Sequence, residues 1–163
     1  MVALFICLLS ACALPAKRDA YGRPVPRWPS WTLKTDNPDP EGLICYDCFY
    51  VSDVKSVGVD HGNYAIIRYW ESGHFIINSV KDYKDLEELN SRYRGRIGYF
   101  RIEDFRIVHE FFQVGSGGGF YVHSVGFVEE DGSVLIMPKK SYPLNPEKYI
   151  PVKVGKVDWE PDW

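Results

Sequence analysis

Residues 98–137 read GYFRIEDFRIVHEFFQVGSGGGFYVHSVGFVEEDGSVLIM, and this stretch decides the fold. It consists of short runs rich in Val, Ile, Tyr and Phe, which favour the extended β conformation. Turn-forming sequences separate the runs: EDFR at 103–106, GSGGG at 115–119 and EEDG at 129–132. Because such turns reverse the chain between neighbouring strands, the stretch predicts a series of antiparallel hairpins.

The run at 107–113 has apolar residues on both of its faces. Residues alternate sides along a strand, so Val108 and Phe112 share one face with Glu110. The opposite face takes the intervening residues, which are Ile107, His109 and Phe111. Because a strand that is apolar on both sides needs cover on both sides, we expect a closed or sandwiched sheet.

The same pattern extends over most of the chain and predicts seven or eight strands, so the expected fold class is all-β and mainly antiparallel. The strands are expected at residues 43–51, 64–70, 74–79, 97–102, 107–113, 120–128, 133–137 and 149–154.

One short helix is expected to interrupt the strands. Its apolar stripe has the three- and four-residue spacing of a helix face and consists of Leu86, Leu89 and Tyr93. We expect Asp82 to cap the start, Asp85 to lie near the positive end of the helix dipole, and Gly95 to end the helix. The stripe is expected to plug an open end of the sheet; binding a partner is the alternative.

Residues 98–137, together with YWESG at 69–73, resemble the repeated hairpins of small lipocalin-like lipoproteins. In those chains Gly-Tyr opens one strand, an Ile-x-x-Glu-Phe strand pairs with it, and a Gly-rich turn leads to the next. The resemblance implies a lipocalin-like up-and-down barrel or half-barrel, which we place at residues 43–157. It transfers no catalytic residue, because the matched positions are structural.

The first fourteen residues, MVALFICLLSACAL, carry no charge and are almost wholly apolar. The run is shorter than the ~20 residues of a membrane-spanning helix and fits the apolar part of a secretory signal. Within it, Leu9-Ser10-Ala11-Cys12 resembles the lipobox of bacterial lipoproteins. The resemblance implies a signal peptide at 1–11 and a diacylglycerol-modified Cys12 that anchors the protein in the bacterial cell envelope. Ala13 after the cysteine implies the outer membrane rather than the inner one if the host is Gram-negative. A buried apolar segment and a non-lipidated signal peptide are the alternatives.

Residues 12–42 hold six prolines, from Pro15 to Pro40. That density excludes a helix or a central strand and predicts a Pro-rich tether or an extended arm. Trp28 and Trp31 interrupt its linker-like composition. We expect these two rings either to fold back as a cover on the barrel or to bind a partner.

The sequence Cys45-Tyr46-Asp47-Cys48 has the spacing of a thiol redox motif. A redox-active pair opens a helix, whose dipole lowers the pKa of the first thiol, whereas the sequence here continues as a strand. A local disulfide between Cys45 and Cys48, or two buried thiols, is therefore favoured over catalysis. Because residues three apart on a strand face opposite sides, a disulfide requires a bulge or a turn at Tyr46 and Asp47.

No metal or cofactor site is expected. The chain has four histidines, at His61, His74, His109 and His123. His109 and His123 fall on consecutive strands, so a zinc site with Glu110 is the one constellation to test. Glu110 faces away from His109, however, and two histidines fall short of three protein ligands. The GSGGG at 115–119 lacks the lysine and helix of a phosphate-binding loop.

The 163 residues carry a formal net charge of −3, which argues against a nucleic-acid binder. We expect a non-enzymatic, lipid-anchored envelope protein that binds a small apolar ligand in the barrel mouth or a protein on its rim. The alternative is a structural or assembly lipoprotein that docks through the Trp28 and Trp31 arm or through the acidic tail at 158–163. An enzymatic function is the least favoured, because the sequence offers no candidate nucleophile paired with a base. The candidate contact residues are Trp28, Trp31, Trp70, Trp159 and Trp163.

Overall fold

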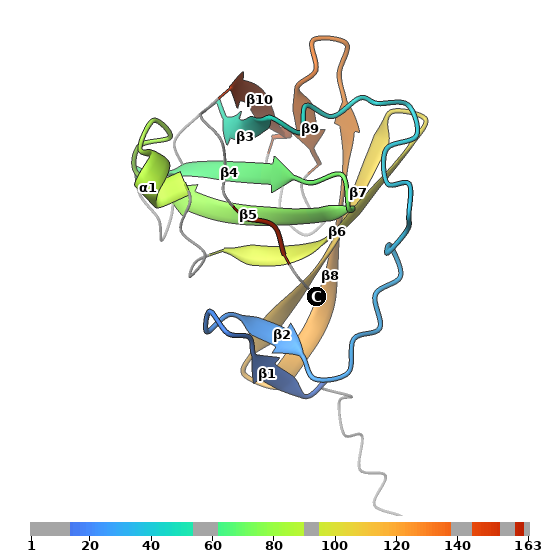
Figure 1. Cartoon of the computed structure of the whole chain (residues 1–163), viewed down its shortest axis with the longest axis vertical. Helices are drawn as coiled ribbons and strands as arrows, with labels where there is room; N and C mark the ends of the chain where they lie inside the picture. The colour runs from blue at the N-terminus through green and yellow to red at the C-terminus, as the bar shows by residue number, and fades with distance from the viewer. Residues whose placement is uncertain (1–13, 54–61, 90–94, 138–144, 154–158, 162–163) are drawn as a thin grey trace, which may run out of the picture.

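The computed structural model describes residues 14–53, 62–89, 95–137, 145–153 and 159–161. In this part of the chain, eight antiparallel strands form a closed barrel in which each strand pairs with the next and the last pairs with the first (Figure 1). The strands are β3 (Cys48–Ser52), β4 (Tyr64–Tyr69), β5 (His74–Val80), β6 (Arg96–Glu103), β7 (Arg106–Gly115), β8 (Gly118–Val128), β9 (Val134–Ile136) and β10 (Glu147–Lys153). The expected all-β, antiparallel, up-and-down fold is confirmed, and the barrel is closed.

The register places one apolar set of side chains inside the barrel. Tyr50 pairs with Ile67 of β4, and Tyr69 of β4 pairs with Phe75 of β5, so these residues share the inner side. Burying a large apolar side chain contributes roughly 1.5–3 kcal/mol. The inner core cluster includes Tyr50, Ile67, Tyr69, Phe75, Phe100, Ile102, Ile107, Phe111, Val122 and Val134.

Two glycines allow the close approaches that the barrel wall requires. A Cβ on Gly98 would lie 1.9 Å from the carbonyl oxygen of Glu110, its diagonal neighbour on β7. A Cβ on Gly119 would lie 1.9 Å from the ring of Phe112. A side chain at either position would therefore force backbone or aromatic groups apart, which explains the glycine at the third position of β6 and the glycine at the second position of β8.

The hairpin between β6 and β7 turns tightly without a glycine. Glu103 pairs with Arg106, and the two residues between them, Asp104 and Phe105, have φ angles of 51° and 62°. A two-residue turn with positive φ at both positions follows the twist of the flanking strands, although non-glycine residues adopt it at a cost of roughly 1–2 kcal/mol each. The Phe105 side chain is exposed at this turn.

The helix α1 is short and lies on the outer side of the barrel. It spans Leu86–Leu89, and Asp85 caps it by accepting hydrogen bonds from the amides of Glu87 (2.9 Å) and Glu88 (3.2 Å). The expectation that Asp82 caps the helix is wrong, because its carboxylate instead accepts a bond from the amide of Lys84 in the preceding turn.

The expected position of the helix at an open end is also wrong. Leu89 packs with four outward-facing residues, namely Phe49, Val51, Ile66 and Val80. It therefore covers the outer face of β3 to β5 instead of plugging the barrel. Tyr93 lies outside the described residues. Gly95, expected at the end of the helix, has φ +96° and directly precedes β6.

Residues 39–47 pack over one end of the barrel and shorten the first strand. Ile44 belongs to the inner core cluster, and the carboxylate of Asp39 accepts bonds from the amides of Leu43 (3.0 Å) and Ile44 (2.9 Å). The strand expected over 43–51 therefore begins only at Cys48. Residues 43–46 are apolar because they cover the core, not because they extend the sheet.

The Pro-rich segment lies along the barrel from residue 14 onward. It begins with the hairpin of β1 (Ala16–Arg18) and β2 (Pro24–Pro26) and then runs up the outside of the barrel (Figure 1). Its prolines lie in short edge strands and extended segments, where the missing N–H groups are tolerated. In the described residues no helix is long and apolar enough to cross a membrane.

Candidate functional site

Aromatic side chains fill the centre of the barrel. The ring of Tyr69 is fully buried and meets the rings of Tyr50 and Phe100 edge-on, with centroids 5.2 Å and 4.8 Å away. Phe75 and His109 pack beside them with ring centroids 4.7 Å apart. The middle of the barrel is thus a packed core, as in other small eight-stranded barrels.

His109 is the polar member of this core. It is fully buried, its Nε2 lies 2.8 Å from the Tyr69 hydroxyl, and its Nδ1 lies 3.3 Å from Oγ of Ser124. Burial lowers the pKa of His109 to about 3, so the imidazole is neutral at pH 7. Burial also raises the pKa of Tyr69 well above its usual value. The neutral imidazole and the two hydroxyls therefore satisfy one another's hydrogen-bonding capacity inside the core.

A cavity of about 460 Å³ lies at the end of the barrel away from residues 39–47. The wall opens here because the pairing of β6 with β7 stops at Gly98 and Phe111, whereas β7 continues to Gly115. Residues from the ends of several strands and from β2 line the opening: Pro24, Ala65, Ile77, Asn78, Ser79, Gly95, Arg96 and Phe112. We call it the mouth cavity.

Arg96 brings a positive charge to the mouth cavity. Its guanidinium carbon lies 5.8 Å from the centre of the Phe111 ring, which faces the barrel interior, so the side chain extends along the inner side. No carboxylate in the described part of the chain pairs with it. The mouth cavity therefore combines apolar walls from Ala65 and Ile77 with one available cation.

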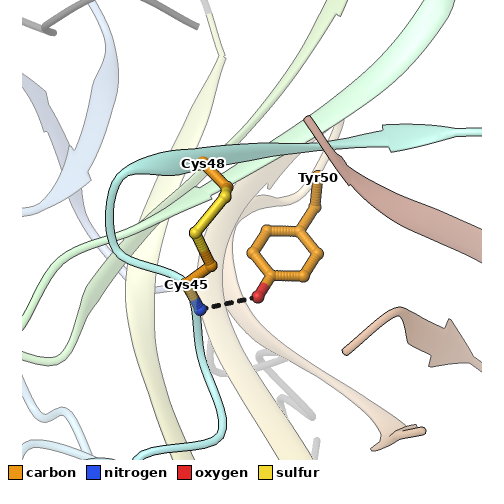
Figure 2. The surroundings of a disulfide bond; sticks show 3 residues. All are labelled: Cys45, Cys48 and Tyr50. Carbon is orange, nitrogen blue, oxygen red and sulfur yellow. Dashed lines mark hydrogen bonds between the residues drawn. A yellow bond between two sulfur atoms is a disulfide. The ribbon is translucent and has the colours of Figure 1, made fainter. Parts of the chain in front are cut away.

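Cys45 and Cys48 form a disulfide at the covered end (Figure 2). The chain turns at Tyr46 and Asp47, and the amide of Cys48 donates to the carbonyl of Cys45 at 3.2 Å. The amide of Cys45 donates to the hydroxyl of Tyr50 at 2.9 Å. The disulfide thus holds the covering segment to an inner core residue, and no helix follows it that could activate a thiol.

A buried carboxylate fastens the N-terminal arm to the outer wall. Glu110 is almost completely buried, and it accepts hydrogen bonds from the amides of Thr32 (2.7 Å) and Leu33 (3.0 Å) and from the Thr32 hydroxyl (3.0 Å). His123 lies 3.2 Å from the same carboxylate. Trp31 packs beside this anchor, with its ring edge-on to that of Tyr121 at 4.9 Å.

The tryptophans expected as contact residues lie in different environments. Trp28 is exposed. Trp31 is half-buried where the arm lies against the barrel. Trp70 and Trp159 are buried against each other with ring centroids 5.4 Å apart, and the Trp70 indole donates to the Trp159 carbonyl at 3.2 Å. Residue 159 of the expected tail therefore rests on the barrel wall. Trp163 and the expected lipidation residue Cys12 lie outside the described residues.

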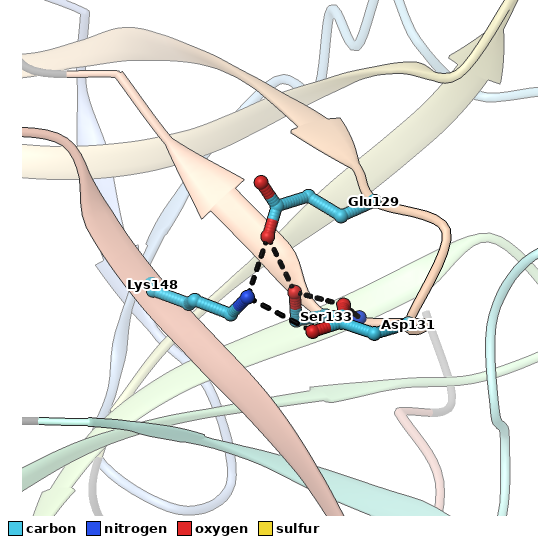
Figure 3. Close-up of polar contacts among 4 residues, drawn as sticks. All are labelled: Glu129, Asp131, Ser133 and Lys148. Atoms are coloured by element: carbon cyan, nitrogen blue, oxygen red, sulfur yellow. Dashed lines mark hydrogen bonds and ion pairs between the residues drawn. The ribbon is translucent and has the colours of Figure 1, made fainter.

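The turn between β8 and β9 holds a small charged network (Figure 3). Lys148 donates to Glu129 at 2.7 Å and to Asp131 at 2.9 Å. The Ser133 amide and hydroxyl also donate to Asp131. The hydrogen bonds from Ser133, followed by that from Lys148, hold the pKa of Asp131 well below its usual value. The network stabilises the turn and pins β10 beside β9.

The structure separates the histidines that the zinc hypothesis brought together. The register opposes Glu110 with His123 and His109 with Ser124, so His109 faces inward and His123 outward. His74 contacts the hydroxyls of Ser72 (2.8 Å) and Tyr99 (3.0 Å). Over the described ranges, no group of three His, Cys, Asp or Glu residues is placed to hold a metal. His61 lies outside those ranges.

Comparison with known proteins found no matching family, no matching curated relative and no matching solved structure. The mouth cavity is therefore interpreted from its own residues.

Sequence reasoning did not find the residues of the mouth cavity. Ala65, Ile77, Ser79 and Arg96 come from three strands and have no shared motif. The available signal was their position: all four face inward in the alternation, and Ala65, Ser79 and Arg96 lie near strand ends. The alternation did place Glu110 and His109 on opposite faces of their strand. Nothing local indicated that Glu110 would hold a segment almost eighty residues away.

Proposed function

We propose that this protein is a non-enzymatic lipoprotein of the bacterial cell envelope that binds a small ligand with an apolar body and an anionic group. The observation that carries the ligand proposal is the mouth cavity, which leaves space at one end of an otherwise packed barrel. Its volume of about 460 Å³ lies within the range of roughly 300–1,000 Å³ typical of small-molecule sites.

The lining explains the chemistry of the proposed ligand. Ala65, Ile77 and Phe112 would contact the apolar body, while Ser79 and Asn78 offer hydrogen-bonding groups beside it. Arg96 has no partner carboxylate in the described ranges, so its guanidinium is available to an anionic group. A fatty acid or a similar amphipathic anion has this combination of groups.

A dansyl-labelled fatty acid and its methyl ester test the proposal by fluorescence titration. Arg96→Gln should weaken binding of the acid by roughly tenfold to a hundredfold, because a charge-assisted hydrogen bond contributes roughly 1.5–3 kcal/mol, and should leave the ester unchanged. Ser79→Phe should block both probes by filling the cavity. Arg101→Gln is the matched control, because Arg101 lies on β6 but faces outward and pairs with Glu103. Unchanged binding of the probes to the Ser79→Phe variant would contradict the assignment of the mouth cavity as the binding site.

The lipid anchor rests on the sequence at Cys12 and has its own test. Growth with labelled palmitate should label the wild-type protein, and Cys12→Ser should abolish the label. Cys7→Ser is the matched control, since Cys7 belongs to the same apolar run but precedes the lipobox. Labelling that persists in Cys12→Ser would contradict the anchor while leaving the ligand proposal untouched.

A second candidate function is docking to an envelope protein. Exposed phenylalanines beside the acidic turn at residues 129–131 favour it. Phe105 and Phe127 are both exposed, and the carbonyl of Phe105 is bonded to the amide of the residue after Phe127. Phe105 also lines a surface hollow with Glu129, Glu130 and Asp131. A photoreactive phenylalanine at 105 should crosslink a protein in cells; crosslinking to lipid alone would contradict docking.

A further inference from the structure

Two segments far apart in the sequence join to form one surface at the lower end of Figure 1. Leu14 and Gly119 exchange two backbone hydrogen bonds of 2.9 Å each, which attach the start of the described chain to the tip of the β7–β8 hairpin. The amide of Arg27 donates to the carbonyl of Pro15 at 2.9 Å, so the residues after β2 return to the same place. We call this the basal surface; it comprises Leu14, Lys17, Arg18, Arg27, Trp28, Val114 and Phe120.

The basal surface exposes large apolar side chains. The exposed fractions are 67% for Trp28, 46% for Phe120, 43% for Val114 and 37% for Leu14. Leu14 and Val114 flank Gly119, which has no side chain, across three neighbouring segments. Val114 also borders a hollow of about 400 Å³ beside Lys17 and Arg18. Phe120 follows Gly119 and therefore faces the other side of the hairpin from Leu14 and Val114. Exposed apolar residues on both sides of one hairpin tip mark a contact surface.

The charges of the basal surface are positive and uncompensated. Lys17, Arg18 and Arg27 are exposed, and none pairs with a carboxylate in the described part of the chain. Asp19, the acidic residue of the β1–β2 hairpin, is neutralised by Arg23 at 2.7 Å. Arg27 lies over the ring of Trp28, with its guanidinium carbon 5.3 Å from the ring centre.

The other end of the β7–β8 hairpin is acidic. Glu129, Glu130 and Asp131 follow directly after β8, and Asp104 lies in the two-residue turn before β7. The ten residues of β7 separate this end from the Gly-rich tip by about 30 Å at ~3.3 Å per residue. Lys148 pairs with Glu129 and Asp131, so this end is only partly compensated. Cations therefore lie beside exposed apolar groups at one end of the hairpin, whereas carboxylates outnumber the nearby lysine at the other.

We propose that the basal surface binds the surface of an anionic lipid bilayer. Tryptophan is favoured at the boundary between headgroups and acyl chains, and exposed apolar residues enter that boundary while Lys and Arg contact anionic headgroups. The acidic end would then point away from the bilayer. The inference does not rest on lipidation of Cys12 or on ligand binding in the mouth cavity, although Cys12 lies only two residues before Leu14 and would bring the same end to the membrane.

An environment-sensitive fluorophore placed at each end of the hairpin tests this orientation. The full chain is prepared as Ser116→Cys or Glu130→Cys with Cys7→Ser and Cys12→Ser, so that the nitrobenzoxadiazole group reacts only at the new, exposed position. The labelled proteins are combined with phosphatidylcholine vesicles that contain or lack phosphatidylglycerol. On anionic vesicles the probe at 116 should brighten severalfold and shift to the blue, whereas the probe at 130 should remain as in buffer.

Charge and apolar variants complete the test. Removing one cation in Lys17→Gln, Arg18→Gln or Arg27→Gln should weaken the response at 116 by about fivefold in lipid concentration, since each basic residue at an anionic surface is worth about that factor. Trp28→Ser should also weaken it, whereas Arg101→Gln should not. Equal responses from the two probes, or equal responses on both kinds of vesicle, would overturn the proposal. The fatty-acid titration and the palmitate label read out the other proposals separately.

Discussion

Glu110 and His123 face each other on the outer wall of the barrel, with 3.2 Å between the carboxylate Oε1 and the imidazole Nε2. Next to Glu110 in sequence, His109 faces the interior and is fully buried. Two adjacent polar residues thus serve different layers of the molecule. Glu110 holds the N-terminal arm against the outside, and His109 completes the core inside.

Removing the Glu110 carboxylate should loosen the arm. Glu110→Ala leaves the amides of Thr32 and Leu33 without their acceptor, which should lower the free energy of unfolding by roughly 1–3 kcal/mol. Glu110→Gln keeps one acceptor and should cost less. Denaturant unfolding measures the loss, and a red shift of the Trp31 emission reports that the arm has moved. Glu103→Ala, at an exposed ion pair with Arg101, should be nearly neutral.

The buried His109 should make the fold sensitive to acid. Its pKa is about 3 in the folded protein against ~6.5 in the unfolded chain, so between these values the unfolded chain binds a proton that the folded one does not. The free energy of unfolding should therefore fall as the pH falls from about 6.5 to 3, by up to ~1.4 kcal/mol per pH unit.

Comparison with His109→Gln isolates this effect, because that variant should show a flatter pH dependence over the same window. If the His109 variant does not fold, the NMR signals of the His109 imidazole in the wild-type protein decide: they should remain those of a neutral ring at pH 5. A protonated signature at that pH would contradict the prediction.

Opening the disulfide should have a modest effect on stability. Cys45 and Cys48 are only three residues apart, so the loop that the bond closes is short and its entropic contribution is about 2 kcal/mol. Cys45→Ser with Cys48→Ser should lower the unfolding free energy by no more than that and leave ligand and vesicle binding intact. Mass spectrometry of the native protein should find the two cysteines bonded; reactive free thiols would contradict the bond.

The pKa of Asp131 should depend more on Ser133 than on Lys148. Ser133 donates from both its amide and its hydroxyl to Asp131, and these bonds are the largest cause of the lowered pKa. Ser133→Ala should raise the pKa of Asp131 toward its usual value, and Lys148→Gln should raise it less. Carbon-detected NMR titration of the Asp131 carboxyl group measures both shifts. A larger rise of this pKa in Lys148→Gln would show instead that the ion pair is the main cause of the lowered pKa.

The barrel was predictable because alternation is a local property. The pattern around Glu103 to Arg106 and the acidic turn before Ser133 determined where strands reverse, and the apolar residues on both faces indicated cover on both sides. The start of β3 was predicted wrongly because Ile44 is apolar for another reason: it covers the end of the barrel. Composition alone cannot distinguish a covering segment from a strand.

The parts that were not predictable depend on contacts between distant segments. Asp82 and Asp85 are equally good caps by composition, and the choice depends on where Leu89 meets the barrel. The sequence of residues 12–42 predicts an extended arm, but only the buried Glu110 shows where it attaches. Arg96 lacks a motif, and its availability to a ligand depends on which carboxylates lie near it in space.

The pairing of β10 with β3 sets a condition on how the molecule can fold. Phe49 pairs with Val152, about a hundred residues later, so the barrel stays open until nearly the whole chain is present. Before that point β3 exposes an unpaired edge that could join another chain. Such long-range pairing slows folding, and a chain emerging from its N-terminus onward must keep that edge protected until its final strand arrives. A factor that shields unfinished sheets is therefore expected to raise the yield of this protein.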